Sequence, residues 1–181
     1  MKEYNLEGFE RGLAELGIAL SEEQKTQFLQ YYALLVEWNS FMNLTAITEF
    51  DQVITKHFLD SLSLVKVCDV AQAGRILDVG TGAGFPGIPL KIAFPEVEVV
   101  LLDSLNKRVK FLNEVIGQLG LSKITAIHGR AEDFARQKEY REQFDLVVSR
   151  AVANLSSLSE YCLPYVKVGG RFVSYKSGKL N

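Results

Sequence analysis

The glycine-rich stretch of this chain reads Asp78-Val79-Gly80-Thr81-Gly82-Ala83-Gly84-Phe85-Pro86-Gly87. It follows the apolar run 75–79 and precedes a segment with helical periodicity. Glycine lets a backbone turn tightly and approach a ligand, because it has no Cβ. The start of a helix adds free N–H groups and a partial positive charge, and Pro86 suits its first turn. The stretch therefore predicts a strand–loop–helix unit that holds a ligand.

The pattern of apolar residues changes near residue 70. Beyond it, short apolar runs at 75–79, 97–103, 124–128, 144–149 and 171–175 alternate with helical segments. This alternation predicts an α/β domain, a Rossmann-like parallel sheet covered by helices on both faces. Before it the pattern is helical. Ser21 and Gln24 form a capping box that opens a long helix ending near Trp38, and a second helical run spans 53–67. We expect residues 1–70 to be an N-terminal helical segment and residues 71–181 to be the Rossmann-like domain.

Composition narrows the class of protein. The chain has 181 residues, 48% hydrophobic residues and a formal net charge of -2. This is typical of a globular chain with one main domain, and it excludes nucleic-acid binding by bulk positive charge. Cys68 and Cys162 lie far apart and form neither a disulfide framework nor a Cys-x-x-Cys metal site, so we expect no metal. With no apparent signal peptide and no 18-residue apolar stretch, the expected location is cytoplasmic, without membrane association.

The loop is compatible with two cofactor classes. Gly82-x-Gly84-x-x-Gly87 matches the dinucleotide fingerprint, so an NAD-dependent oxidoreductase remains an alternative. Asp78 stands two residues before the first glycine, and glycines recur at alternate positions from Gly80. This pattern resembles the first motif of S-adenosylmethionine-dependent methyltransferases of the Rossmann-like class. The added features favour S-adenosylmethionine as the cofactor.

Polar residues follow the later strands, at the edge where parallel sheets bind ligands. Asp103 ends the second strand, where its carboxylate suits ribose hydroxyls, and the alternative is a cap for the next helix. After the third strand, Ala131 and Glu132 are candidates to hold an adenine edge, with a favourable first-turn acid as the alternative. Arg150 follows the fourth strand and is a candidate partner for a cofactor carboxylate, for Glu132 or for a phosphate.

The whole set of motifs resembles the RsmG family, also known as GidB. Its signature is similar to Leu77–Leu90, and its later motifs to 102–104, 129–132 and 149–151. The N-terminal part is similar in Trp38-Asn39, Asn43-Leu44-Thr45 and residues 57–61. The resemblance implies S-adenosylmethionine-dependent methylation of guanine N7 in small-subunit (16S) ribosomal RNA. The implied partner is that RNA or its assembling particle.

The resemblance also assigns site residues. Together with Gly82 of the loop, the expected cofactor-binding residues are Gly80, Phe85, Asp103, Ala131, Glu132 and Arg150. Weaker candidates for substrate contacts are Asn39, His57, Arg108 and Lys176. The alternative for Phe85 is a plain core aromatic, and that for His57 is a satisfied histidine on a helix face. Because guanine N7 has a free lone pair, we expect catalysis by positioning, with no catalytic acid or base.

One feature departs from the resemblance. The sequence stops just past the fifth predicted strand, whereas this class of methyltransferase has two more strands. The expectation is therefore a C-terminally incomplete domain. A third hypothesis is a truncated domain that binds cofactor or RNA without turnover. We expect a monomer.

Overall fold

The computed structural model describes residues 3–150 and 155–175. Before the sheet come helices α1 (Glu7–Leu16), α2 (Glu22–Asn39), α3 (Phe50–Val53) and α4 (Asp60–Leu62), the π-helical turn η1 (Ile54–Leu59), and the 3₁₀ turns η2 (Ser63–Lys66) and η3 (Val70–Gln72). The strands are β1 (Arg75–Val79), β2 (Glu98–Asp103), β3 (Ile124–His128), β4 (Phe144–Ser149) and β5 (Val166–Ser174). Between them lie α5 (Gly87–Ala93), α6 (Asn106–Leu119), α7 (Ala131–Phe134), α8 (Leu155–Cys162) and the 3₁₀ turn η4 (Leu163–Tyr165).

The described strands form one parallel sheet in the order β3-β2-β1-β4-β5. β1 is central and pairs with β2 on one side and β4 on the other. The chain moves outward from β1 to β3 and then returns to β4, so the strand order reverses beside β1. Open α/β sheets bind ligands at such a switch point, outside the carboxyl ends of the strands.

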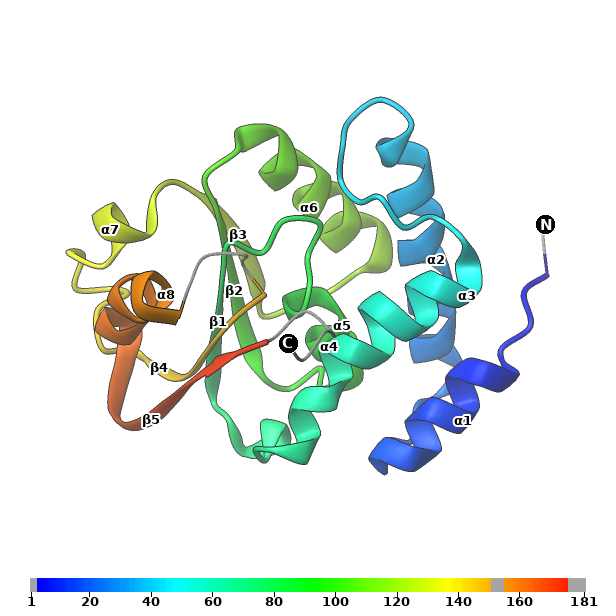
Figure 1. Ribbon diagram of the computed structural model, residues 1–181, viewed down its shortest axis with the longest axis horizontal. Helices are drawn as coiled ribbons and strands as arrows, with labels where there is room; N and C mark the ends of the chain where they lie inside the picture. Colours follow the sequence, from blue (N-terminus) through cyan, green and yellow to red (C-terminus); the bar gives the residue numbers. More distant parts are fainter. Residues whose placement is uncertain (1–2, 151–154, 176–181) are drawn as a thin grey trace.

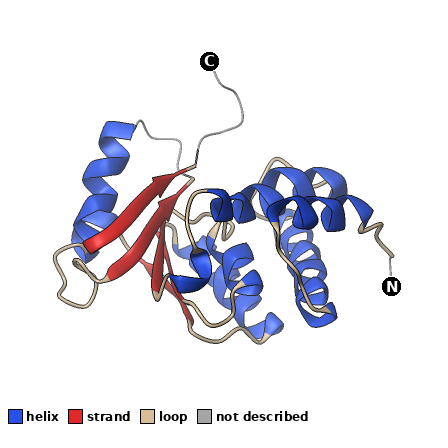
Figure 2. Ribbon diagram, turned by 90° about the horizontal axis from the view of Figure 1, so that it is seen from below, coloured by secondary structure: helices blue, strands red, loops and turns tan. Residues whose placement is uncertain are grey.

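Helices cover both faces of the sheet (Figures 1 and 2), and a hydrophobic core lies on each face. On one face lie α5 and α6, with the N-terminal helices packed outside them, and on the other lie α7, α8 and η4. In the first core, Phe9, Phe28 and Phe58 pack on one another, and the core continues to Leu101 of the sheet. The expected boundary near residue 70 is therefore crossed by continuous apolar packing.

Local signals set several elements as expected. Ser21 Oγ accepts from the Gln24 N–H (3.1 Å) and Gln24 Oε1 accepts from the Ser21 N–H (2.7 Å), so the predicted capping box is confirmed. Gln24 also donates to the Ile92 carbonyl of α5 (2.9 Å), which ties α2 to the sheet layer. The predicted α/β fold with a parallel sheet is confirmed. No described helix is both long enough and apolar enough to cross a membrane.

Three expectations differ from the structure. The fifth strand begins at Val166 rather than Arg171, because pairing with β4 extends over residues that look like a turn in sequence. The helical run 53–67 is not one α-helix, since η1 interrupts it. Pro86 precedes α5 instead of lying in its first turn, because that helix begins at Gly87.

Candidate active site

A cavity of about 430 Å³ opens at the carboxyl ends of β1, β2 and β3, in the size range of small-molecule sites. Its walls come from three loops of the sheet and from α8. They are Val79, Gly80, Leu102, Asp103, Ser104, Gly129, Arg130, Ala131, Glu132, Leu158 and Tyr161. The structure thus brings together four predicted cofactor residues, namely Gly80, Asp103, Ala131 and Glu132.

Asp78 shapes the glycine loop from beneath. Its Oδ2 accepts from Thr81 Oγ1 (2.7 Å) and from the Gly87 N–H (2.9 Å), so one carboxyl oxygen holds both ends of the loop in place. Its Oδ1 is fully buried and has no hydrogen-bond partner within the described part of the chain. Burial raises the pKa of Asp78 to about 8, although the two hydrogen bonds and Arg150 lower it. The carboxyl is therefore largely protonated at neutral pH in this arrangement.

Asp103 joins the glycine loop to the loop after β2. Its buried carboxylate accepts from the Gly82 N–H through Oδ2 (2.8 Å) and from the Leu105 N–H through Oδ1 (2.9 Å). Arg108 Nη1 lies 3.7 Å from Oδ2. A carboxylate oxygen has two lone pairs, so each one keeps acceptor capacity toward the cavity. Gly82 itself does not line the cavity but orients Asp103.

Phe85 and Arg150 are not among the residues that line this cavity. Phe85 is buried, with His57 stacked on its ring at 4.3 Å between centroids. It also packs near Tyr31 and Phe58. The Arg150 guanidinium lies over the same ring, 5.5 Å from its centroid. The Phe85 ring therefore supports the side chains of His57 and Arg150.

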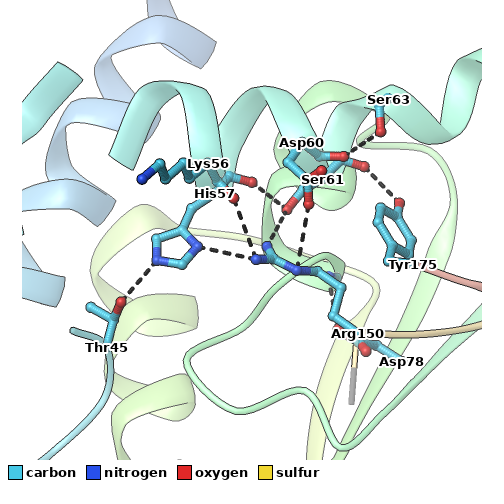
Figure 3. Close-up of polar contacts among 10 residues, drawn as sticks. Thr45, Lys56, His57, Asp60, Ser61, Ser63, Asp78, Arg150 and Tyr175 are labelled. Atoms are coloured by element: carbon cyan, nitrogen blue, oxygen red, sulfur yellow. Dashed lines mark hydrogen bonds and ion pairs between the residues drawn. The ribbon is translucent and has the colours of Figure 1, made fainter. Parts of the chain in front are cut away.

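Arg150 is surrounded by acceptors from the N-terminal helical part (Figure 3). Its Nη2 donates to the Lys56 carbonyl and to His57 Nδ1, each at 3.3 Å. Its Nη1 donates to Ser61 Oγ at 3.5 Å, and its Nε lies 3.6 Å from Asp60 Oδ2. The predicted option of a pair with Glu132 is wrong in this structure, because residues of η1 and α4 take up the guanidinium.

His57 joins this cluster to the loop after α2. Its Nε2 lies 2.8 Å from Thr45 Oγ1, and its Nδ1 faces Arg150. Burial first, and the charge of Arg150 second, lower the pKa of His57 to about 4. The ring is therefore neutral at physiological pH.

Comparison with known proteins identifies the chain. The family model described as rRNA small subunit methyltransferase G matches residues 24–181. The ribosomal RNA small subunit methyltransferase G of Lachnoclostridium phytofermentans is 63% identical over 172 residues, which are 95% of this chain and 71% of that protein. The chain belongs to the rRNA small subunit methyltransferase G family. The ribosomal RNA small subunit methyltransferase G of Clostridium kluyveri is 56% identical over 162 residues, which cover 90% of this chain and 68% of that protein.

A solved structure shares the fold. The O-methyltransferase of Bacillus cereus, crystallised in complex with SAH, has a TM-score of 0.60 and 23% identity, covering 80% of this chain and 65% of that chain. The predicted class I methyltransferase sheet and the resemblance to the RsmG family are both confirmed.

The weaker substrate-side candidates occupy different places in this family member. Asn39 Oδ1 accepts from the N–H groups of Leu44 and Thr45 (2.9 and 3.0 Å), so it shapes the loop after α2. Arg108 is half-buried beside Asp103. Lys176 lies outside the described residues. Among those that are described, no group of three or more His, Cys, Asp or Glu is arranged to hold a metal ion.

The sequence did not predict two residues that line the cavity of this methyltransferase fold. Leu158 and Tyr161 reach it from α8, which arrives over the sheet from the β4–β5 connection. Their spacing of three residues places them on one helix face, but nothing in the sequence says which ligand that face covers. Thr45 belongs to the motif Asn43-Leu44-Thr45, but the motif does not predict its contact with His57, which depends on the fold.

Proposed function

We propose that this chain transfers the methyl group of S-adenosylmethionine to N7 of a guanine in small-subunit ribosomal RNA. Family membership supports the reaction, and the cavity at the switch point supports a nucleoside-sized cofactor. The observation that carries the choice of cofactor is the charge around the glycine loop.

Two carboxyl groups lie under that loop, and each takes an N–H group from it. Gly82 donates to Asp103 and Gly87 donates to Asp78. A pyrophosphate needs such N–H groups pointed at itself, whereas these two are already taken by carboxyl groups of the chain. S-adenosylmethionine instead brings a sulfonium and an ammonium, which suit the carboxylate of Asp103 on the cavity wall. This arrangement favours S-adenosylmethionine over the NAD-dependent alternative.

The residues that we assign to the cofactor fall into two groups. Asp103 is proposed to accept ribose hydroxyls, while Ala131 and Glu132 hold the adenine edge, from positions on the cavity wall. Gly80 gives the backbone close approach, and Gly82 orients Asp103. The second group does not line the cavity: Phe85 lies under the guanidinium of Arg150, and Arg150 is proposed to contact the carboxylate of the cofactor.

Catalysis in this proposal comes from positioning. Bound S-adenosylmethionine supplies a methyl group on a sulfonium, whose leaving group is a neutral thioether, so the transfer needs no metal. Guanine N7 has a lone pair at neutral pH and needs no general base. The chain's own residues then orient the two reactants and exclude water, effects that contribute roughly 7–11 kcal/mol in favourable cases. Asp103 favours positive charge near the loop, on either reactant, and Asp78 does so once it has lost its proton.

RNA must be held by local positive charge, since the net charge is -2. Lys56, Lys107 and Arg130 are exposed near the carboxyl edge of the sheet and are candidates for phosphate contacts. Asn39 and His57 use their side chains inside the protein, so we assign them indirect roles, and Lys176 remains a substrate-side candidate. We further propose that the chain acts as a monomer in the cytoplasm, which light scattering and cell fractionation would test.

One experiment tests the function. The chain is titrated with S-adenosylmethionine and with NAD by calorimetry, and then incubated with labelled S-adenosylmethionine and unmethylated small subunits. We expect binding of S-adenosylmethionine alone and label in the RNA at a site cleaved by borohydride and aniline, the chemistry of N7-methylguanine. NAD binding alone would overturn the cofactor assignment. Cofactor binding without transfer to naked RNA or particles would favour the non-catalytic binding domain.

A further inference from the structure

The Arg150 clamp, meaning Lys56, His57, Asp60 and Ser61 around the guanidinium, depends on the π-helical turn. In a continuous α-helix the carbonyl of residue 56 would accept from the N–H of residue 60. Here the Asp60 N–H donates to the His57 carbonyl, and the Lys56 carbonyl accepts from Arg150 Nη2. π turns inside helices occur often at functional sites. The turn therefore aims one carbonyl and one imidazole at the same guanidinium nitrogen.

The hydrogen bonds fix which nitrogen of His57 carries the proton. A guanidinium has only donors, so Nδ1 must accept from Arg150 and the proton must lie on Nε2. Thr45 Oγ1 accepts that proton and also accepts from the Ile47 N–H (3.0 Å). Asn39 in turn holds the Thr45 N–H. A chain of contacts thus runs from Asn39 at the end of α2 to Arg150, and Figure 3 shows its part from Thr45 onward.

We propose that His57 is a positioning residue whose Nδ1 acceptor holds the Arg150 guanidinium over Phe85, with Thr45 fixing the tautomer that makes this possible. The inference rests on the proposed function, in which Arg150 contacts the cofactor. It goes further by naming the residue that orients Arg150 and the atom that does so. A histidine that only filled space against Phe85 would not require a particular nitrogen to be free of a proton. The low pKa of His57 agrees with a ring that stays neutral beside a cation.

Amide substitutions separate the two nitrogens. The side-chain oxygen of His57→Asn lies near the place of Nδ1, so it keeps the acceptor for Arg150. The amide of His57→Gln lies near the place of Nε2, so it keeps the contact with Thr45 but loses that acceptor. We expect His57→Asn to bind S-adenosylmethionine within threefold of the wild type and His57→Gln to bind about tenfold more weakly. Thr45→Val should weaken the binding of S-adenosylmethionine, whereas Thr45→Ser keeps the hydroxyl and should bind it like the wild type.

Tyr32→Phe is the matched control for a general loosening of this region. Tyr32 donates to the Thr48 carbonyl (2.6 Å), in the same loop as Thr45, and has no described contact with Arg150. The control should lower the midpoint of urea unfolding and leave the dissociation constant unchanged. If Tyr32→Phe and His57→Gln weaken binding equally, the effect is loop stability and the positioning role is wrong.

A spectroscopic readout tests the tautomer without the cofactor. The chain has two histidines, so the ring ¹⁵N signals of His57 are assigned by comparison with His57→Asn. We expect an Nε2–H tautomer whose Nδ1 signal shifts in Arg150→Ala. An Nδ1–H tautomer, or wild-type affinity in His57→Gln, would overturn the inference. Failure of the wild type to bind S-adenosylmethionine would instead overturn the proposed function, while the ¹⁵N signals would still decide whether His57 holds Arg150.

Discussion

The free energy of unfolding should fall as the pH rises from 6.5 to 8, and the buried carboxyl of Asp78 is the cause. Burial raises the pKa of this group to about 8 in the folded chain, whereas its ordinary value is 3.8. Between these values the folded chain holds a proton that the unfolded chain releases. Stability from this group is therefore fully present below the unfolded pKa and is lost as the pH rises through the folded pKa.

Other groups limit the window in which this slope is visible. The pKa of His57 is lowered from 6.5 to about 4, so its contribution has the opposite sign and is lost as the pH falls below 6.5. Burial lowers the pKa of Lys91 to about 8, so its contribution to stability also has the opposite sign and becomes large only near and above that pH. Between pH 6.5 and 8 the Asp78 proton dominates. One proton changes stability by about 1.4 kcal/mol per pH unit at most, and flattening near the folded pKa leaves about 1.5 kcal/mol over the window.

Urea unfolding followed by circular dichroism at half-unit steps of pH measures this loss. Asp78→Asn is the matched variant, because its amide oxygen can still accept from Thr81 and Gly87 while the titrating proton is removed. We expect the variant to be flat across the window, whatever its absolute stability. A wild-type stability that stays constant or rises from pH 6.5 to 8 would refute the reasoning, and so would a slope that survives in Asp78→Asn.

Four further outcomes follow from the same contacts. Asp103→Asn should cost about 2 kcal/mol of stability and weaken S-adenosylmethionine binding at least tenfold, because a buried charged acceptor of two N–H groups is lost. Asp145→Asn, which also removes a carboxylate that accepts a backbone N–H (2.8 Å from Arg75), should lower stability and leave the calorimetric affinity unchanged. Gly87→Ala places a Cβ 2.2 Å from Leu101 Cδ2 and 2.9 Å from Asp78 Oδ2, so urea unfolding should reveal a loss of about 1–3 kcal/mol. Binding of S-adenosylmethionine at pH 7 should release protons from Asp78, and equal binding heats in buffers of different ionisation enthalpy would contradict this.

Local signals were sufficient where the sequence itself contains the cause. The strands 75–79, 124–128 and 144–149 agree with β1, β3 and β4 to the residue, since buried parallel strands are short apolar runs. Non-local pairing set the rest. The first half of β5 contains Lys167, Gly169 and Gly170, and it is a strand because β4 lies beside it. The π turn has the same apolar spacing as an α-helix, so periodicity does not reveal it.

The candidate site divides in the same way. Asp103 was found because it ends a strand that follows the glycine loop, and the carboxyl edge of a parallel sheet gathers such ends. The partners of Arg150 could not be found, because they lie about ninety residues earlier and meet it only when the N-terminal helices pack on the sheet. The same packing explains why Phe85, predicted as a cofactor contact, supports His57 and Arg150 instead of lining the cavity.

Burial keeps Asp78 protonated, and the clamp on Arg150 leaves that carboxyl without an ion pair. The charge of Arg150 lowers the pKa of Asp78, but burial outweighs it, so the arginine does not neutralise the carboxyl. The Arg150 guanidinium is instead bound by acceptors on η1 and α4, including the carboxylate of Asp60. The amino-acid end of S-adenosylmethionine carries an ammonium and a carboxylate, and a site that keeps Asp78 and Arg150 unpaired with each other offers a partner for each.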